Sequence, residues 1–229
     1  MRRKTELIVM LTYDDLTVKN AAEIFEECKD TPASIWGFKE QPLPLPDMQA
    51  LFARMKECGK TTALEVVAYD EPACIAGAET AVRCGVDILM GTCFYDSVAK
   101  ICKENGLRYT PFVGTVSGRP SVLEGNAEDM LAEAKFALSH GADGIDLLGY
   151  RYTGDAAALN RRIVSGLDAP VCIAGSVDSF ARLDEVLRTA PDSFTIGSAL
   201  FDNCFGGSIR EQIERICEYI DRFGTGETS

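Results

Sequence analysis

The stretch "PVCIAGSVDSFARLDEVLRTAPDSFTIGSALFD", residues 170 to 202, shows the same pattern twice. One apolar run ends in Gly175-Ser176, and a second apolar run ends in Gly197-Ser198. The segment between the two runs fits a helix. A strand, a helix and another strand in this order are typical of a βα repeat, in which the strands lie parallel.

The same repeat extends along the whole chain. Helix signals stand between the apolar runs, such as Asp47 before "MQALFARMKECG", Glu71-Pro72 before "ACIAGAETAVRCG", and "NAEDMLAEAKFALSHG", which closes at Gly141. The apolar and β-branched runs predict eight strands, at residues 7–12, 33–39, 61–68, 87–93, 108–114, 144–150, 171–176 and 193–198.

Eight βα units in 229 residues predict an α/β fold of one domain, a (β/α)8 TIM barrel. We expect the barrel to span residues 1–223 and the final "GTGETS", residues 224–229, to form a disordered tail. A doubly wound open sheet is the alternative arrangement of the same elements. No linker or low-complexity stretch divides the chain.

The two Gly-Ser turns fall at the ends of the seventh and eighth predicted strands. In TIM barrels the turns after these strands commonly hold phosphate, because backbone N–H groups there can approach an oxyanion closely. We therefore expect Gly175, Ser176, Gly197 and Ser198 to bind the phosphate of a small molecule. The alternative is that each pair makes only a tight turn, with serine as a helix N-cap.

Three stretches carry a resemblance to a known group of barrels. These are "CGVDILMGTCFYDSVAKICKENGLRYTPFVG" from residue 84, "HGADGIDLLGY" from residue 140, and "PVCIAGSV…TIGSALF". Over residues 85 to 202 the chain resembles the ribulose-phosphate-binding barrels, and within them the keto-deoxy-phosphogluconate aldolases. The resemblance implies a phosphate-binding TIM barrel acting on a phosphorylated sugar or keto acid.

The sixth predicted strand departs from that aldolase pattern. The resemblance implies a Schiff-base lysine where this chain has Asp146. A carboxylate cannot form an imine with a carbonyl substrate, so the aldolase mechanism cannot run from this position.

Charged residues in or beside apolar strands are the remaining candidates for catalysis. Asp146 and Glu65 lie within strands, and Lys39 ends one. A carboxylate and a lysine in one pocket can remove a proton beside a carbonyl and hold the enolate. Asp146 is the first choice for acid–base chemistry, Glu65 the second, and Lys39 the electrophile, anion partner or a relocated Schiff-base amine. The alternative is a structural layer of ion pairs.

Two arginines are candidates for binding substrate. Arg119 lies in "VSGRPSVLEG", residues 116–125, the longest predicted connection on the active face, which suggests a lid. Arg151 follows the sixth strand. Either guanidinium can pair with a phosphate or carboxylate, and a solvated arginine is the alternative for Arg119.

Several other functions find little support. The single histidine, His140, is expected at a helix C-terminus, which disfavours histidine-based zinc sites and catalytic triads. Cys93 is expected to be a buried filler. Dinucleotide and P-loop motifs are absent, and the chain is short for a flavin barrel. We expect no cofactor, and no residue pattern calls for a divalent metal.

Composition points to a cytoplasmic protein. The nine cysteines form no CxxC pair, as expected in a reducing compartment, and the first apolar run is too short for a signal peptide or membrane span. The net charge of −12 argues against nucleic acid or anionic membrane as a partner. Barrels of this size often associate through outer helices, so a homo-oligomer is compatible with the sequence.

The sequence therefore predicts an enzyme of sugar-phosphate metabolism that uses enolate or enediolate chemistry, as an epimerase, an isomerase or an aldolase-type lyase. The alternative is a barrel that keeps the phosphate site without catalysis, as a sensor of phosphorylated metabolites or a partner protein. The missing lysine in strand six motivates this second class.

Overall fold

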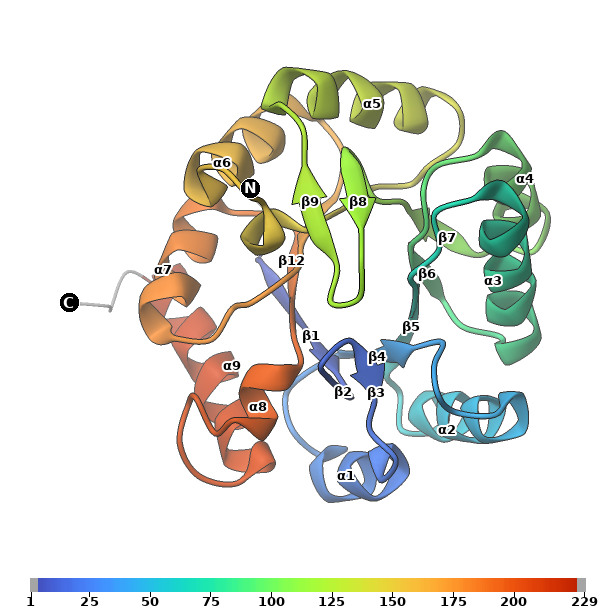
Figure 1. Cartoon of the computed structure of the whole chain (residues 1–229). Helices are drawn as coiled ribbons and strands as arrows, with labels where there is room; N and C mark the ends of the chain where they lie inside the picture. Colours follow the sequence, from blue (N-terminus) through green and yellow to red (C-terminus); the bar gives the residue numbers. More distant parts are fainter. Residues whose placement is uncertain (1–3, 226–229) are drawn as a thin grey trace.

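The computed structural model describes residues 4–225. Eight parallel strands alternate with helices and curve into a nearly closed barrel, with the helices outside (Figure 1). The TIM-barrel prediction and all eight predicted strands are confirmed. The strands are β1 (Glu6–Met10), β4 (Ile35–Lys39), β5 (Thr61–Val66), β6 (Ile88–Gly91), β7 (Arg108–Thr110), β10 (Ile145–Leu147), β11 (Val171–Ile173) and β12 (Ser193–Ile196).

The barrel has one weak seam. The continuous sheet runs in the order β10-β11-β12-β1-β4-β5-β6-β7. Two backbone hydrogen bonds join its ends: Asp143 N–H donates to Tyr109 O at 2.8 Å, and Asp146 N–H donates to Pro111 O at 2.9 Å. Pro111 has no N–H of its own, so the ladder between β7 and β10 stays short. These bonds rule out the doubly wound open sheet.

The helices follow the local signals in the sequence. The third helix begins after Asp70, whose side chain accepts from Ala73 N–H, and ends at Gly85 with φ 64°. The described helices are α1 (Ala21–Cys28), α2 (Leu45–Glu57), α3 (Glu71–Cys84), α4 (Asp96–Glu104), α5 (Ala127–Ser139), the 3₁₀ turn η1 (Gly149–Arg151), α6 (Ala156–Gly166), α7 (Phe180–Thr189), α8 (Ser198–Phe201) and α9 (Ile209–Thr225).

Both faces of the barrel strands are buried. On β1, Leu7 and Val9 pack in the core beneath the helices, whereas Ile8 and Met10 point into the barrel. The interior cluster consists of Ile8, Met10, Ile35, Ala63, Ile88, Met90 and Cys172. Because side chains alternate along a strand, Lys39 and Glu65 continue the interior face at the carboxyl ends of β4 and β5. The interior of the barrel is therefore lined by apolar side chains in its middle and by the charged side chains of Lys39 and Glu65 at its mouth.

Two small hairpins stand at this mouth. They are β2 (Thr12–Tyr13) with β3 (Leu16–Thr17), and β8 (Thr115–Ser117) with β9 (Val122–Glu124). Figure 1 shows the β8–β9 hairpin lying across the middle of the ring, with its turn toward β2 and β3. The segment 116–125, predicted as a long connection, is therefore largely an ordered hairpin over the barrel.

The last helix extends to the end of the residues that the structure describes. The last helix, α9, continues to Thr225, and the rest of the predicted tail, residues 226–229, lies outside the described residues. No helix among residues 4–225 is long and apolar enough to cross a membrane.

Candidate active site

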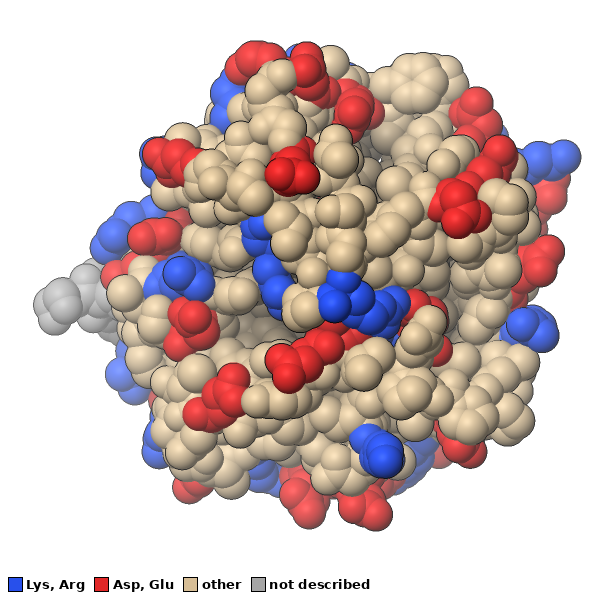
Figure 2. Space-filling view, in the orientation of Figure 1, with Lys and Arg blue, Asp and Glu red and all other residues tan. Residues whose placement is uncertain are grey.

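A pocket of about 180 Å³ opens at the carboxyl ends of the strands. Figure 2 shows this face hollowed near its centre, with Lys or Arg and Asp or Glu atoms beside the hollow. Of the residues predicted from sequence, the pocket is lined by Lys39, Glu65, Arg151, Gly175, Ser176, Gly197 and Ser198. The structure therefore brings together the predicted catalytic lysine, one predicted carboxylate and both Gly-Ser turns.

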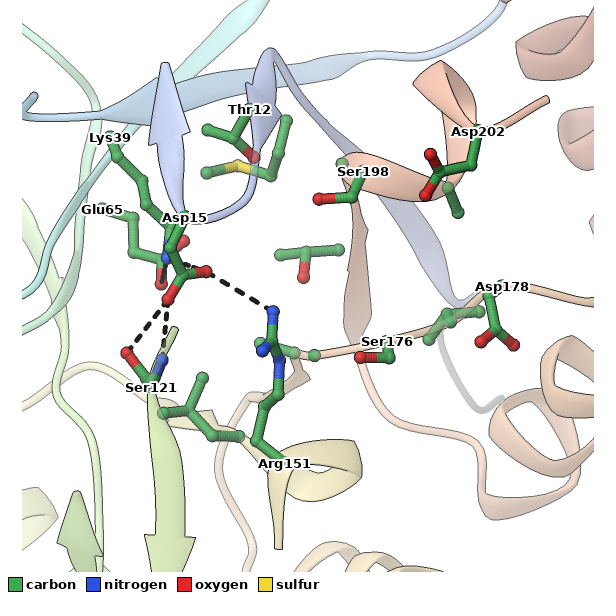
Figure 3. A pocket seen from close by; sticks show the side chains of 18 residues that line it. Thr12, Asp15, Lys39, Glu65, Ser121, Arg151, Ser176, Asp178, Ser198 and Asp202 are labelled. Atoms are coloured by element: carbon green, nitrogen blue, oxygen red, sulfur yellow. Dashed lines mark hydrogen bonds and ion pairs between the residues drawn. The ribbon is translucent and has the colours of Figure 1, made fainter. Parts of the chain in front are cut away.

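A buried ion cluster forms one side of the pocket (Figure 3). The Lys39 ammonium lies 3.0 Å from Asp15 Oδ1 and 3.1 Å from Glu65 Oε1. All three side chains are buried, with exposed fractions between 6% and 8%. The Glu65 carboxylate also lines the pocket. One cation is thus paired with two carboxylates.

Asp15 owes its position to the β2–β3 hairpin. Asp14 and Asp15 form the two-residue turn, with φ of 48° and 62°. Aspartate tolerates this left-handed backbone better than most residues, which suits it to such hairpins. The turn points the Asp15 side chain back into the barrel mouth, where Ser121 N–H donates to Asp15 Oδ2 at 2.8 Å. Asp15 therefore joins the β8–β9 hairpin to the ion cluster.

The pKa values in this cluster shift in opposite directions. Burial alone would raise the pKa of Asp15, but Lys39 and the Ser121 N–H lower it below its ordinary value. Burial alone would lower the pKa of Lys39, but Glu65 and Asp15 raise it. Burial raises the pKa of Glu65 against the opposing charge of Lys39. Asp15 and Lys39 are thus the firmly ionised pair, and Glu65 is the more readily protonated carboxylate.

The two Gly-Ser turns form the opposite side of the pocket. The backbone N–H groups of Ser176, Gly197 and Ser198 donate to no protein acceptor among residues 4–225. Figure 3 shows the Ser176 and Ser198 hydroxyls directed toward the cavity. Gly175 has φ 101°, and a Cβ there would lie 3.1 Å from Arg151 Cγ, so glycine is required. These turns leave several donors open to an oxyanion.

The predicted arginines lie on either side of Asp15. Arg151 Nη2 is 3.5 Å from Asp15 Oδ1, within the pocket. Arg119 donates from Nη1 to the Asp15 carbonyl at 3.1 Å and pairs through Nη2 with Glu40 at 2.7 Å. Arg119 does not line the pocket. Through these two contacts Arg119 links the β8–β9 hairpin to the β2–β3 turn and to Glu40 after β4.

Asp146, the first choice for acid–base chemistry, does not line the pocket. It is fully buried, and neither of its oxygens has a hydrogen-bond partner among residues 4–225. In register it pairs with Cys172, which lines the opening at the other end of the barrel. Burial and then the charge of Glu65 raise the pKa of Asp146 well above its ordinary value. Asp146 is thus a carboxyl group held deeper in the barrel than Glu65.

Two other residues singled out in the sequence lie away from the pocket. His140 caps the C-terminus of α5, exposed, with its ring stacked on Phe136. Cys93 is half-buried beside α5, and burial raises the pKa of its thiol. Among residues 4–225, no group of three His, Cys, Asp or Glu side chains could hold a metal ion.

Sequence reasoning missed three residues at the center of the site. Asp15 is one of these, although "TYDDLT" has the two-residue aspartate turn typical of a tight hairpin. Ser121 reaches the pocket only because the β8–β9 hairpin crosses the mouth. Thr12 lines the pocket beside Gly197, where a Cβ would lie 2.5 Å from Thr12 Oγ1.

The fold and the pocket define a class: a single (β/α)8 barrel with a polar pocket at the carboxyl ends of its strands. No family model matches the chain, and no curated protein matches its sequence. Among solved structures, members of the ribulose-phosphate-binding barrels share the fold, as the sequence resemblance implied.

Three such structures illustrate the likeness. The native KDPGal structure superposes with a TM-score of 0.70 at 15% identity, over 98% of both chains. Orotidine 5′-phosphate decarboxylase from Pyrococcus horikoshii gives 0.67 at 17%, over 94% of this chain and 99% of that one. The tryptophan synthase alpha chain from Legionella pneumophila gives 0.67 at 13%, over 97% and 94%. At such low identity the likeness shows the fold.

Proposed function

We propose that this barrel is an enzyme that binds a phosphorylated carbonyl compound and works through an enolate or enediolate. The observation that carries the proposal is one pocket with two unlike sides. Open N–H groups and hydroxyls of two Gly-Ser turns face a buried cluster of Lys39, Asp15 and Glu65. The first side suits an oxyanion, and the second suits proton transfer beside a carbonyl.

The phosphate would bind at the Gly-Ser turns. The Ser198 hydroxyl accepts from Asp14 N–H at 3.2 Å, which leaves its own proton free to donate. Two carboxylates, Asp178 and Asp202, lie near these turns but are exposed. Solvent screens their repulsion, whereas the N–H groups point directly at the oxyanion. One structural neighbour, orotidine 5′-phosphate decarboxylase, is named for a phosphate ester, which supports this reading.

Proton transfer would fall to Glu65 and Lys39. Glu65 Oε2 takes the proton from the carbon beside the carbonyl, and the C–H electron pair moves toward the carbonyl oxygen. The Lys39 ammonium then holds the developing negative charge. A lysine with a raised pKa between two carboxylates stays protonated. It therefore suits an electrophile better than the nucleophilic amine of a relocated Schiff base.

Asp146 has no direct part in this proposal. Its carboxyl group does not line the pocket, so it cannot reach a substrate bound there. Acid–base chemistry is accordingly assigned to Glu65, the second choice from the sequence. Epimerisation and isomerisation begin with removal of the C–H proton beside the carbonyl, whereas aldol-type cleavage begins with removal of a hydroxyl proton as the carbon–carbon bond breaks. All three form a carbonyl-stabilised carbanion.

A specific observation favours a second candidate, a barrel that binds a phosphorylated metabolite without acting on it. Lys39 is satisfied by two carboxylates, as in a structural ion pair, and Asp146 replaces the lysine of the aldolase pattern. A sensor or partner protein needs the Gly-Ser turns but not a free base. Measurements of binding and of proton exchange separate the two candidates.

Binding is tested by thermal-shift titration with inorganic phosphate and a panel of sugar and keto-acid phosphates. A ligand at 100 times its Kd stabilises the fold by about 2.7 kcal/mol, which is readily measured. The Ser176→Asp/Ser198→Asp variant should lose this shift through charge repulsion. The Ser139→Asp/Ser165→Asp variant adds the same charge on exposed helix ends and should keep it. A wild type that no phosphate compound shifts refutes the proposal.

Catalysis is tested by following loss of carbon-bound protons in heavy water with the ligand that binds. We expect exchange with wild type and a loss of about 10²–10⁴-fold with Glu65→Gln, the range of general-base catalysis. Tight binding without exchange in wild type would assign the barrel to the sensor class.

A further inference from the structure

Asp15 neutralises the cations of the pocket from inside the protein. Its carboxylate lies 3.0 Å from the Lys39 ammonium and 3.5 Å from the Arg151 guanidinium. Ser121 contributes two further donors, N–H at 2.8 Å and Oγ at 3.3 Å. Figure 3 shows these groups converging on Asp15 from three sides. The place where a ligand carboxylate could form ion pairs is thus already taken.

The remaining charge on this side of the pocket is also unfavourable to an anion. Glu65 shares the Lys39 ammonium with Asp15, so two buried carboxylates face one buried cation. A second negative group on a ligand would have to displace Asp15 or lie beside it without a cation. Both outcomes are costly in a buried site, because an uncompensated charge there is poorly solvated.

Neutral hydroxyl groups line other parts of the pocket. Thr12, Ser121 and Thr195 line the pocket with side chains that both donate and accept hydrogen bonds. Thr195 is buried on β12, one residue from the strand end that leads into Gly197. Such a surface matches a sugar chain, whose hydroxyl groups donate and accept hydrogen bonds and whose carbonyl oxygen accepts them.

From this geometry we infer that Asp15 is a specificity-determining residue, which restricts the ligand to phosphorylated aldehydes, ketones or polyols without a carboxylate. The inference rests on the proposed function and narrows it, since sugar phosphates are retained and keto-acid phosphates are rejected. Asp15 forms the ion pairs with Lys39 and Arg151 that a ligand carboxylate would otherwise form, and it repels a second negative charge.

The test compares ligand pairs that differ only in oxidation state. Glyceraldehyde 3-phosphate is paired with 3-phosphoglycerate, and erythrose 4-phosphate with 4-phosphoerythronate. Dissociation constants are measured by calorimetry at constant ionic strength, with inorganic phosphate as the reference for the Gly-Ser turns. We expect wild type to bind the aldehyde of each pair at least about 10-fold more tightly than the acid.

The Asp15→Asn variant should reverse or abolish this preference. Asparagine keeps an acceptor for Ser121 N–H but removes the charge, so Arg151 becomes free to pair with a ligand carboxylate. We expect the ratio of the two affinities to move toward the acid by about 10-fold or more. The control is Asp202→Asn, which removes another pocket carboxylate, one that accepts from Tyr13 and contacts neither cation. The ratio of aldehyde affinity to acid affinity in Asp202→Asn should equal that of wild type.

Arg151→Met provides an independent test should Asp15→Asn fold poorly. If Asp15 neutralises Arg151, losing the guanidinium leaves the preference for the aldehyde at its wild-type level or strengthens it. If Arg151 instead binds a ligand carboxylate, wild type binds the acid at least as tightly as the aldehyde and the variant loses affinity for the acid, and the inference is wrong.

Failure of the inference differs from failure of the proposed function. Wild type that binds phosphoglycerate as tightly as the aldehyde refutes the role of Asp15 and leaves the phosphate site intact. Wild type that binds neither compound nor inorganic phosphate refutes both.

Discussion

Lys39 is the residue on which the ion cluster depends. Replacing it with methionine leaves Glu65 buried without a cation and Asp15 with Arg151 alone, 3.5 Å away, and breaking a buried pair in this way costs about 3–5 kcal/mol. We expect urea denaturation of Lys39→Met to show such a loss. Adding Glu65→Gln to that variant should restore part of the stability, because the carboxylate that lost its cation is then replaced by a neutral amide.

Lys100→Met is the matched control for this prediction. Lys100 is exposed and lies 3.9 Å from Glu104 on α4, where an ion pair contributes little. We expect its free energy of unfolding to stay within about 0.5 kcal/mol of wild type. An equally small effect of Lys39→Met would show that the cluster is not a stabilising unit.

Asp146 makes stability depend on pH. Burial and Glu65 raise its pKa in the folded state, so the folded protein holds this proton more tightly than the unfolded chain. The stabilisation is complete below the ordinary aspartate pKa and is lost as pH rises toward the folded pKa. The loss is about 1.4 kcal/mol per pH unit for one group.

The Asp146→Asn variant should lack this contribution. We expect its stability relative to wild type to increase as the pH is raised from 4 to 8 in urea denaturation, by an amount set by about 1.4 kcal/mol per unit. Asp168→Asn, at an exposed position, serves as the control. A constant difference between Asp146→Asn and wild type at all pH values would contradict the raised pKa.

At the scale of elements, the turn after β11 is built around one glycine. Gly175 has φ 101°, and a Cβ would meet Arg151 at 3.1 Å. Gly175→Ala therefore combines backbone strain with a close contact, for an expected loss of about 1–3 kcal/mol. The control is Gly59→Ala, where φ is 73° and no atom lies within 4 Å of the added Cβ.

The two alanine variants should also differ in ligand binding. Gly175→Ala moves the Ser176 N–H and should weaken the thermal shift by phosphate, whereas Gly59→Ala should leave it unchanged. Equal thermal shifts in both variants would show that the β11 turn is not part of the proposed phosphate site.

The elements differ in how well the sequence predicted them. The eight barrel strands are apolar runs separated by helix signals, so their existence and order could be predicted. Their facing could not, because strands buried on both faces read as continuous apolar runs. This is why Lys39 and Glu65 could be identified but not oriented. Asp146 lies inside the barrel, but an apolar run does not show where along it the strand ends, so its depth below the pocket could not be predicted.

The two hairpins at the barrel mouth, in contrast, could not be predicted from the sequence. Each strand of β2–β3 and β8–β9 has only two or three residues, too few for a periodic pattern. The contact from Ser121 to Asp15 spans 106 residues of sequence, so no local signal reports it. The Gly-Ser turns were predicted because their residue types and their place after strands seven and eight are both local.

At the scale of the whole molecule, the barrel should open first at its seam. The β7 and β10 strands are joined by two backbone hydrogen bonds, whereas β4 and β5 pair in register over five residues. We expect amide hydrogen exchange to be faster in β7 and β10 than in β4 and β5. Mass spectrometry of exchanged peptides measures this, and equal protection around the ring would contradict it.

The acidic surface has a consequence for how ligands arrive. The chain carries a net charge of −12, and carboxylates border the hollow at the mouth (Figure 2). A phosphate dianion must therefore diffuse inward against long-range repulsion. Raising the ionic strength from about 0.01 M to about 0.15 M shortens the Debye length from about 30 Å to about 8 Å, so stopped-flow association should become faster. Anions would thus enter slowly, and only the short-range donors of the two turns would retain them.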